Sequence, residues 1–251
     1  MSSAIWTQCA GDSERKPLRL APWRVVEAQH EVSTRKLVDS AAEQALLETL
    51  IEGVKPPAVG NARQHYLLTT PFRHPPLRHG SRFGTRVERG LWYGSETLPT
   101  AFVEVAYYRL LFLEGTRASL TPLSASLTAF RVRTHTANGV DLVAPPFATF
   151  RDAIASPVSY TASQALGAAM RAAGVELFRF PSARDPGGVN IAAFTPTVFG
   201  RAEPRDLQRW HAVATHDVVE FTRRELRRAP EHWRVPRDTL LVDGVLPRPA
   251  V

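Results

Sequence analysis

The chain has 251 residues, of which 44% are hydrophobic, so it is long enough for one large domain, or one domain with extensions, around a sizeable core. Its single cysteine, Cys9, excludes an internal disulfide framework and a cysteine-based zinc site. The net charge of +7 is compatible with nucleic acid, an anionic ligand or an acidic protein partner.

The N-terminal residues and the apolar runs bear on where the protein resides. The first residues lack the charged leader and apolar core of a secretory signal. No apolar run approaches the roughly 20 residues that span a bilayer. A lone cysteine also fits a reducing compartment. We therefore expect a soluble, cytoplasmic protein with no membrane partner.

The first quarter of the chain predicts an irregular lead-in, a strand and a helix. Residues 1–21 show no apolar periodicity. Residues 22–27 predict a strand, because tryptophan and valine suit a half-buried surface. From residue 32 to 51 apolar residues recur at three- and four-residue steps, which predicts a helix. Within it, Ser40 followed by Glu43 has the pattern of a capping box.

Short strands are predicted next, at 66–68 and 91–93. The loop at 71–80 is rich in proline and histidine. Its histidines, His74 and His79, come without a matching carboxylate or cysteine pattern, so no metal site is predicted.

The remaining elements also read as short strands and helices. In chain order they are a helix at 97–113, a strand at 126–134, a hairpin turn at Asn138-Gly139, a helix at 160–173 ended by Gly174, a strand at 175–180, a polar loop at 181–188, a strand at 190–194, a helix at 206–228 and a proline-rich tail.

Mixed short strands and helices without regular alternation predict an α+β fold rather than a doubly wound parallel sheet. No glycine-rich dinucleotide fingerprint or phosphate-loop lysine motif is present. We expect an irregular lead-in at 1–21, a main domain at 22–200 with a helical insertion near 32–55, and a helical C-terminal extension with a proline-rich tail at 201–251.

Two charged residues stand inside apolar stretches. Glu104 falls within the helix predicted at 97–113, and no cation stands three or four positions away. It therefore faces solvent, finds a distant partner or serves a site. Arg24 lies in a strand that otherwise reads as core, so it needs an anion, either a carboxylate or a ligand phosphate.

Other candidate residues each have a structural and a functional interpretation. Arg82 stands among small residues and is a surface loop arginine or a phosphate ligand. Tyr93 fills the core or stacks on a flat ring. Thr161 is a helix N-cap or a phosphate contact. Ser182 and Arg184 lie in the polar loop after a strand, and Asn190 follows six residues beyond, so these residues serve the turn or bind a ligand.

The densest cationic run is at 223–228, interrupted by an acid and a leucine. It is typical of a solvated helix face, with an acidic partner or a nucleic-acid patch as the alternative.

In this order the segments resemble the RES-domain family, named for its arginine, glutamate and serine, from about Trp23 to Phe199. The matching segments are Trp23-Arg24-Val25 for the first strand, Gly80-Ser81-Arg82-Phe83 for the arginine turn, Tyr93 and Glu104 for the tyrosine–glutamate pair, residues 160–166 for the helix start that carries the serine, and residues 181–184 with 190–192 for the closing loop and strand. Thr161 stands where many members have serine. Gly84-Thr85 stands where short members have Asn-Pro, and the chain resembles a long form.

The resemblance implies a fold similar to ADP-ribosyltransferase toxins, with mixed or antiparallel sheets and flanking helices. It implies an enzyme that cleaves the nicotinamide–ribose bond of NAD by hydrolysis or phosphorolysis, without a cofactor and, for phosphorolysis, with inorganic phosphate as co-substrate. The implied residues are Glu104, Arg82 and Tyr93 as catalytic, and Arg24, Arg82, Tyr93, Thr161, Ser182 and Asn190 as NAD-binding.

The resemblance also implies partners. Family members are toxins of two-gene systems, so NAD and an Xre-like antitoxin are the expected partners, with nucleic acid reached only through the antitoxin complex. A protein mono-ADP-ribosyltransferase toxin is the alternative. A non-catalytic basic module that uses residues 223–228 for nucleic acid or an acidic protein is the second alternative.

Overall fold

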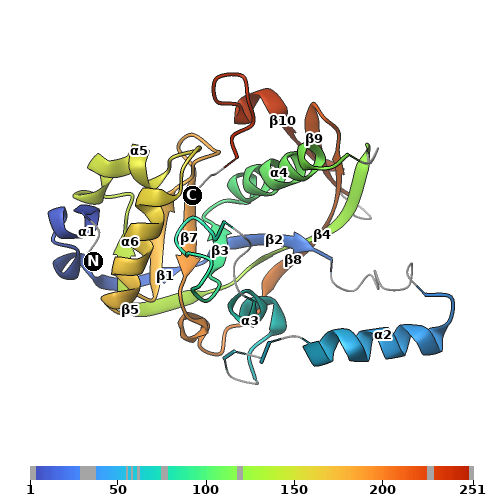
Figure 1. Ribbon diagram of the computed structural model, residues 1–251, viewed down its shortest axis with the longest axis horizontal. Coiled ribbons are helices and arrows are strands. Elements are labelled where there is room, and N and C mark those ends of the chain that lie inside the picture. Colours follow the sequence, from blue (N-terminus) through green and yellow to red (C-terminus); the bar gives the residue numbers. More distant parts are fainter. Residues whose placement is uncertain are drawn as a thin grey trace.

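The computed structural model describes residues 4–28, 38–54, 56–57, 59–60, 63–74, 79–117, 121–224 and 229–248. This described part is built on one ten-stranded sheet with the strand order β1-β5-β6-β7-β3-β2-β4-β8-β9-β10 (Figure 1). Neighbouring strands are antiparallel except β5 and β6, which are parallel. The α+β class, with a mixed sheet and flanking helices, is confirmed.

The strands are β1 (Lys16–Leu20), β2 (Trp23–Glu27), β3 (Trp92–Ser95), β4 (Leu123–Arg131), β5 (Thr134–Asp141), β6 (Leu177–Pro181), β7 (Val189–Ala193), β8 (Arg205–Ala214), β9 (Val218–Arg223) and β10 (Glu231–Pro236). The helices are α1 (Ala4–Gln8), α2 (Ala41–Val54), α3 (Tyr66–Arg73), α4 (Leu98–Gly115), α5 (Arg151–Ile154) and α6 (Thr161–Ala172), with 3-10 turns η1 (Gly11–Glu14), η3 (Phe147–Phe150), η4 (Pro196–Phe199) and η5 (Arg237–Leu240).

The core lies on both faces of the sheet, because successive side chains of a strand point to opposite sides. In β7, Ala192 packs in a cluster that includes Leu166 of α6. Its neighbour Ile191 packs in another cluster with Leu68 of α3. The helices α6 and α3 therefore cover opposite faces.

Helix α4 lies on the α6 face of the sheet. Asn190, two positions before Ala192 and hence on the same side of β7, contacts Glu104 of α4. Further along, the ring of Phe102 stacks on that of Phe221 in β9, with centroids 4.4 Å apart. The site described below forms between α4 and this face.

Several predicted helix ends are confirmed, and capping groups explain where these helices begin and end. The Thr97 Oγ1 accepts a hydrogen bond from Thr100 N at 3.2 Å and begins α4, close to the predicted start. The capping box is confirmed, since Glu43 N donates to Ser40 Oγ at 3.1 Å and Ser40 N donates to Glu43 Oε2 at 3.2 Å. The helix of this box runs over Ala41–Val54, and its predicted first residues, 32–37, lie outside the described residues. Gly174 follows α6 with a φ of 74°, as the helix end predicted.

The irregular lead-in at 1–21 was a wrong prediction. Ile5 and Trp6 of α1 are buried, and β1 pairs with β5. Lys16-Pro-Leu-Arg-Leu has little strand character of its own, and its backbone is satisfied by a partner strand more than a hundred residues away along the chain.

The strand predicted at 66–68 is helix α3 instead. His65 Nδ1 accepts from Leu67 N at 3.2 Å and caps it. Leu68 and Phe72, four positions apart on one face of the helix, are both buried.

The hairpin turn predicted at Asn138-Gly139 lies inside β5. A Cβ on Gly139 would stand 2.5 Å from Leu18 Cγ of the paired strand β1. The glycine therefore allows close packing between strands rather than a positive φ.

The helix predicted at 206–228, and with it the helical C-terminal extension, is wrong. Residues 205–223 form β8 and β9, and β8 pairs with β4 inside the sheet. Trp210, Ala212 and Ala214 are buried at two-residue steps, which is the period of a strand. Residues 225–228 of the cationic run lie outside the described residues, and Arg223 forms an ion pair with Glu231 at 3.2 Å.

Candidate active site

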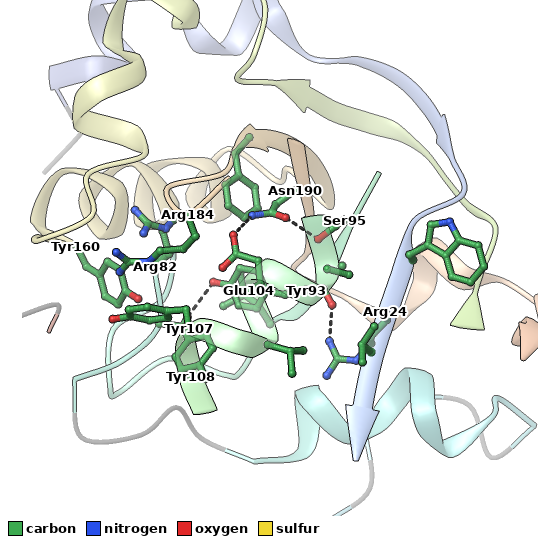
Figure 2. Close-up of a pocket in the computed structure, with 18 residues that line it drawn as sticks. Arg24, Arg82, Tyr93, Ser95, Glu104, Tyr107, Tyr108, Tyr160, Arg184 and Asn190 are labelled. Carbon is green, nitrogen blue, oxygen red and sulfur yellow. Dashed lines mark hydrogen bonds between the residues drawn. The ribbon is translucent and has the colours of Figure 1, made fainter. Parts of the chain in front are cut away.

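A cavity of about 300 Å³ lies between α4 and the strands β2, β3 and β7. Eighteen residues line it, and Figure 2 shows the labelled polar and aromatic side chains gathered around it. Five of the predicted site residues line this cavity, namely Arg24, Arg82, Tyr93, Glu104 and Asn190.

Glu104 is the one carboxylate among the described lining residues. Its Oε1 accepts from Ser182 Oγ at 2.7 Å and from Asn190 Nδ2 at 2.5 Å. The Asn190 amide is itself oriented by Ser95, whose Oγ donates to Asn190 Oδ1 at 2.7 Å. Both bonds to the carboxylate therefore end on one oxygen, and Oε2 receives none from the described part of the chain. Glu104 therefore has partners that are distant in the sequence. The structure brings three predicted residues together, namely Glu104, Ser182 and Asn190.

Tyr93 of β3 braces the turn that carries the arginine. Its Oη lies 3.0 Å from Ser81 Oγ and accepts from Phe83 N at 3.2 Å. Burial raises the pKa of Tyr93 to about 12. The tyrosine thus stays protonated near neutrality and connects β3 to the residues on both sides of Arg82.

Arg82 points into the cavity and is held by backbone carbonyls. Its Nη1 donates to Ser156 O at 2.9 Å and to Ile154 O at 3.3 Å. The guanidinium carbon lies 4.8 Å from the centroid of the Tyr160 ring, at the start of α6. A neutral carbonyl and a ring face fix the plane of the guanidinium without cancelling its charge.

Arg24 of β2 is held in the same way at another part of the wall. Its Nη1 donates to Tyr93 O at 2.5 Å, and its guanidinium carbon lies 5.2 Å from the Trp92 ring centroid. Burial lowers the pKa of Arg24 to about 10, so the group remains charged at pH 7. The anion that its strand position predicted is not a carboxylate of the described residues, because Arg24 forms no ion pair with any of them.

Thr161 lies outside this cavity. It is exposed, its Oγ1 accepts from Ser159 Oγ at 3.1 Å, and it lines a separate groove beside α1. Nor is it the N-cap, because α6 is preceded by Tyr160 and has no side-chain cap. The prediction that Thr161 contacts NAD phosphates is therefore not supported by its position.

Among the other lining residues are Arg184, a candidate from the polar loop, and Tyr107 and Tyr160, for which the sequence predicted no binding role. A signal for Tyr107 was present, since it stands three positions after Glu104 and so lies on the same helix face. In the sequence, Tyr160 is recognisable only as part of a helix start. Nothing in the sequence indicates that the loop of Arg184 folds back against α4.

Within the described residues the cavity holds three guanidinium groups and a single carboxylate, and no ion pair joins them. The balance favours an anionic ligand. No group of three histidine, cysteine or acidic side chains able to hold a metal ion occurs in the described ranges. Across the same ranges, no helix has the length and apolar character needed to cross a membrane.

The fold and the site define an α+β protein with a cationic cavity built around one oriented carboxylate. The family model for the RES domain matches residues 55–238, well over half of the chain, and the protein belongs to the RES-domain family. The limits predicted for the main domain, residues 22 and 200, differ from those of this match and remain a prediction.

No curated protein matches the sequence. Among solved structures, the crystal structure of the M. tuberculosis MbcT–MbcA toxin–antitoxin complex is similar to the chain, with a TM-score of 0.49 and 14% sequence identity over 85% of this chain and 93% of the other.

Proposed function

We propose that the protein is an NAD-consuming enzyme that cleaves the nicotinamide–ribose bond, and that it is the toxin of a toxin–antitoxin pair. Membership of the RES-domain family supports both parts of the proposal. The observation that carries the enzymatic part is the arrangement of Glu104, held on one oxygen in a cavity whose other charges are unpaired arginines.

The charges of the cavity suit the charges of NAD. Arg82 binds the phosphates, because a planar guanidinium donates two parallel hydrogen bonds to phosphate oxygens, and Arg24 binds the flanking ribose hydroxyls. A cavity of about 300 Å³ is at the lower end of ligand pockets, so it takes only part of a dinucleotide. The adenosine half then extends toward solvent.

Glu104 acts on the ribose next to the nicotinamide. As the C–N bond breaks, positive charge develops on the sugar, and a fixed carboxylate stabilises it without reorganising. Ser182 and Asn190 hold Oε1, which leaves Oε2 directed to the sugar. Nicotinamide leaves with the bonding electrons, and water or inorganic phosphate attacks the sugar carbon.

Tyr93 has a positioning role in this proposal rather than a stacking one. Its hydroxyl is engaged by Ser81 and Phe83, and its ring meets Phe180 at a centroid distance of 6.2 Å. It supports the turn of Arg82 and forms the wall beside the ribose.

The test is the concentration of NAD over time with the purified protein, with and without inorganic phosphate. We expect Glu104→Gln, which keeps the shape and removes the charge, to lower the rate by about 100-fold or more. The variant Glu48→Gln, on exposed helix α2, is the matched control and should retain the full rate. Unchanged NAD consumption by Glu104→Gln would remove Glu104 from the mechanism.

The same assay identifies the acceptor. Loss of NAD only with phosphate indicates a phosphorylase, and loss in both conditions indicates a hydrolase. If the folded wild type consumes no NAD alone but a partner protein gains the mass of ADP-ribose, the enzyme is a transferase. Relief of NAD loss by a co-expressed Xre-like antitoxin tests the toxin part of the proposal.

A further inference from the structure

Arg184 carries a buried donor that the fold leaves unused. Only 5% of the residue is exposed. Its Nη2 donates to Pro157 O at 2.9 Å, whereas Nη1 is buried with no hydrogen-bond partner among the described residues. An unpaired charged donor in a protein interior is costly, so this group points to a ligand that completes it when the cavity is filled.

Arg184 and Arg82 are held by one stretch of chain. The carbonyls of Ile154 and Ser156 accept from Arg82, and the next carbonyl, that of Pro157, accepts from Arg184. Figure 2 shows the two guanidinium groups at the same end of the cavity, with Arg24 at the other. Carbonyls are neutral, so two full positive charges are fixed together, and neither forms an ion pair with an acid of the described residues.

Each of these guanidinium groups also lies on an aromatic ring. The guanidinium carbon of Arg184 is 3.7 Å from the Tyr107 ring centroid, and that of Arg82 is 4.8 Å from the Tyr160 ring centroid. Tyr107 is in turn fixed by the chain near its C-terminus, since its Oη donates to Pro247 O at 2.6 Å. The two planes are thus set before any ligand arrives, which lowers the entropy cost of binding.

We propose that Arg184 is a further substrate-binding residue and forms one anion subsite with Arg82, which takes a pyrophosphate group. The identity of the whole substrate rests on the proposed function. In that dinucleotide, the pyrophosphate is the part that carries two negative charges. Binding of inorganic pyrophosphate to this subsite can be tested without turnover, because pyrophosphate has no glycosidic bond. Two fixed guanidinium groups present parallel N–H donors to the oxygens of both phosphates.

The experiment is calorimetric titration of inorganic pyrophosphate and, separately, nicotinamide riboside into the wild type, Arg184→Gln and Arg19→Gln. Arg19 is exposed on the edge strand β1, so its variant makes the same change in net charge away from the cavity. We expect Arg184→Gln to bind pyrophosphate about tenfold or more weakly. Its binding of nicotinamide riboside, which has no phosphate, and the pyrophosphate affinity of Arg19→Gln should stay at wild-type values.

Two results would overturn the inference. One is wild-type pyrophosphate affinity in Arg184→Gln. The other is an equal loss for pyrophosphate and nicotinamide riboside with a lowered Tm, which would mean that Arg184 only supports the fold. If Arg184→Gln does not fold, Arg184→Lys decides, because it keeps the charge and loses the planar fork. Pyrophosphate affinity equal to the wild type in that variant overturns the inference, and a loss supports it.

Failure of the proposed function gives a different pattern. In that case the wild type consumes no NAD, yet Arg184→Gln still loses pyrophosphate affinity, and the anion subsite stands without the glycosidic reaction. If NAD is consumed and pyrophosphate affinity does not depend on Arg184, the enzyme stands and the subsite fails.

Discussion

Three arginines of the cavity are held by the same two kinds of contact. Arg24, Arg82 and Arg184 each donate to a backbone carbonyl and each lie over the face of an aromatic ring. Backbone and ring fix position, whereas a carboxylate would also neutralise the charge. Residues held in this way keep their charge for a ligand.

The buried hydroxyl of Tyr107 predicts how the stability of the protein depends on pH. At pH 7, Tyr107→Phe should lower the free energy of unfolding by about 1 kcal/mol, since the bond to Pro247 O is lost. Burial raises the pKa of Tyr107 from 10 to about 12. Because the folded value is the higher one, the contribution of the hydroxyl is complete below pH 10 and is lost as the pH rises toward 12.

The stability advantage of the wild type over Tyr107→Phe should therefore shrink between pH 10 and 12. Urea unfolding of both proteins at pH 7, 9, 10 and 11 measures it. A difference that stays constant across this range would contradict the assignment of the alkaline loss to Tyr107.

At the scale of elements, the active-site turn is set by α6. Gln164 Nε2 donates to the carbonyls of His79 and Ser81, at 3.1 and 3.0 Å. Gly167 allows the helix to approach, because a Cβ there would stand 2.2 Å from Phe83 O. The helix therefore fixes both the backbone before Arg82 and the backbone after it.

This contact predicts the effect of one methyl group. Gly167→Ala forces the turn away from α6 and should cost about 1–3 kcal/mol of stability, with a loss of activity from the displaced Arg82. Gly53→Ala is the matched control, since nothing lies within 4 Å of a Cβ there, and it should be neutral or up to about 1 kcal/mol stabilising. Thermal unfolding and NAD consumption measure the two effects, and a wild-type Tm for Gly167→Ala would show that the turn yields freely.

At the scale of the molecule, chain segments remote in sequence close over α4. Strands β8 and β9 pack against α4, and so does the segment that follows η5 (Figure 1). In that segment Leu246 is fully buried among residues of α4 and the sheet. The same segment supplies the carbonyl that fixes Tyr107. The region expected to be a separate helical extension is thus part of the core that supports the site.

Two neighbouring residues of that segment, Leu246 and Val245, differ in burial, so substituting each one tests whether burial in this segment stabilises the fold. Leu246→Ala should lower the free energy of unfolding by about 2–5 kcal/mol, through lost contacts and the cavity left behind. Val245→Ala changes a side chain that is 64% exposed and should stay within about 0.5 kcal/mol. Urea unfolding of both variants is the measurement, and equal values for the two would show that the segment does not stabilise the fold.

Features that depend on near neighbours in the chain could be predicted from the amino-acid order. The Ser40–Glu43 box and Gly174 indicated helix ends, because capping groups bond to backbone only a few residues away. The order of arginine, tyrosine and glutamate segments indicated the family, which the RES-domain match confirms.

Contacts between residues remote in the chain depend on the fold. Glu104 is joined to Ser182 across 78 positions and to Asn190 across 86, and no local pattern encodes such a distance. The same holds for β8, whose backbone is satisfied by β4, and for Arg184, whose loop folds back onto Tyr107. Backbone pairing and burial between remote segments outweigh local helix propensity, so the strands at 205–223 could not be predicted from the sequence. The position of Arg184 beside Arg82 is likewise visible only in the fold.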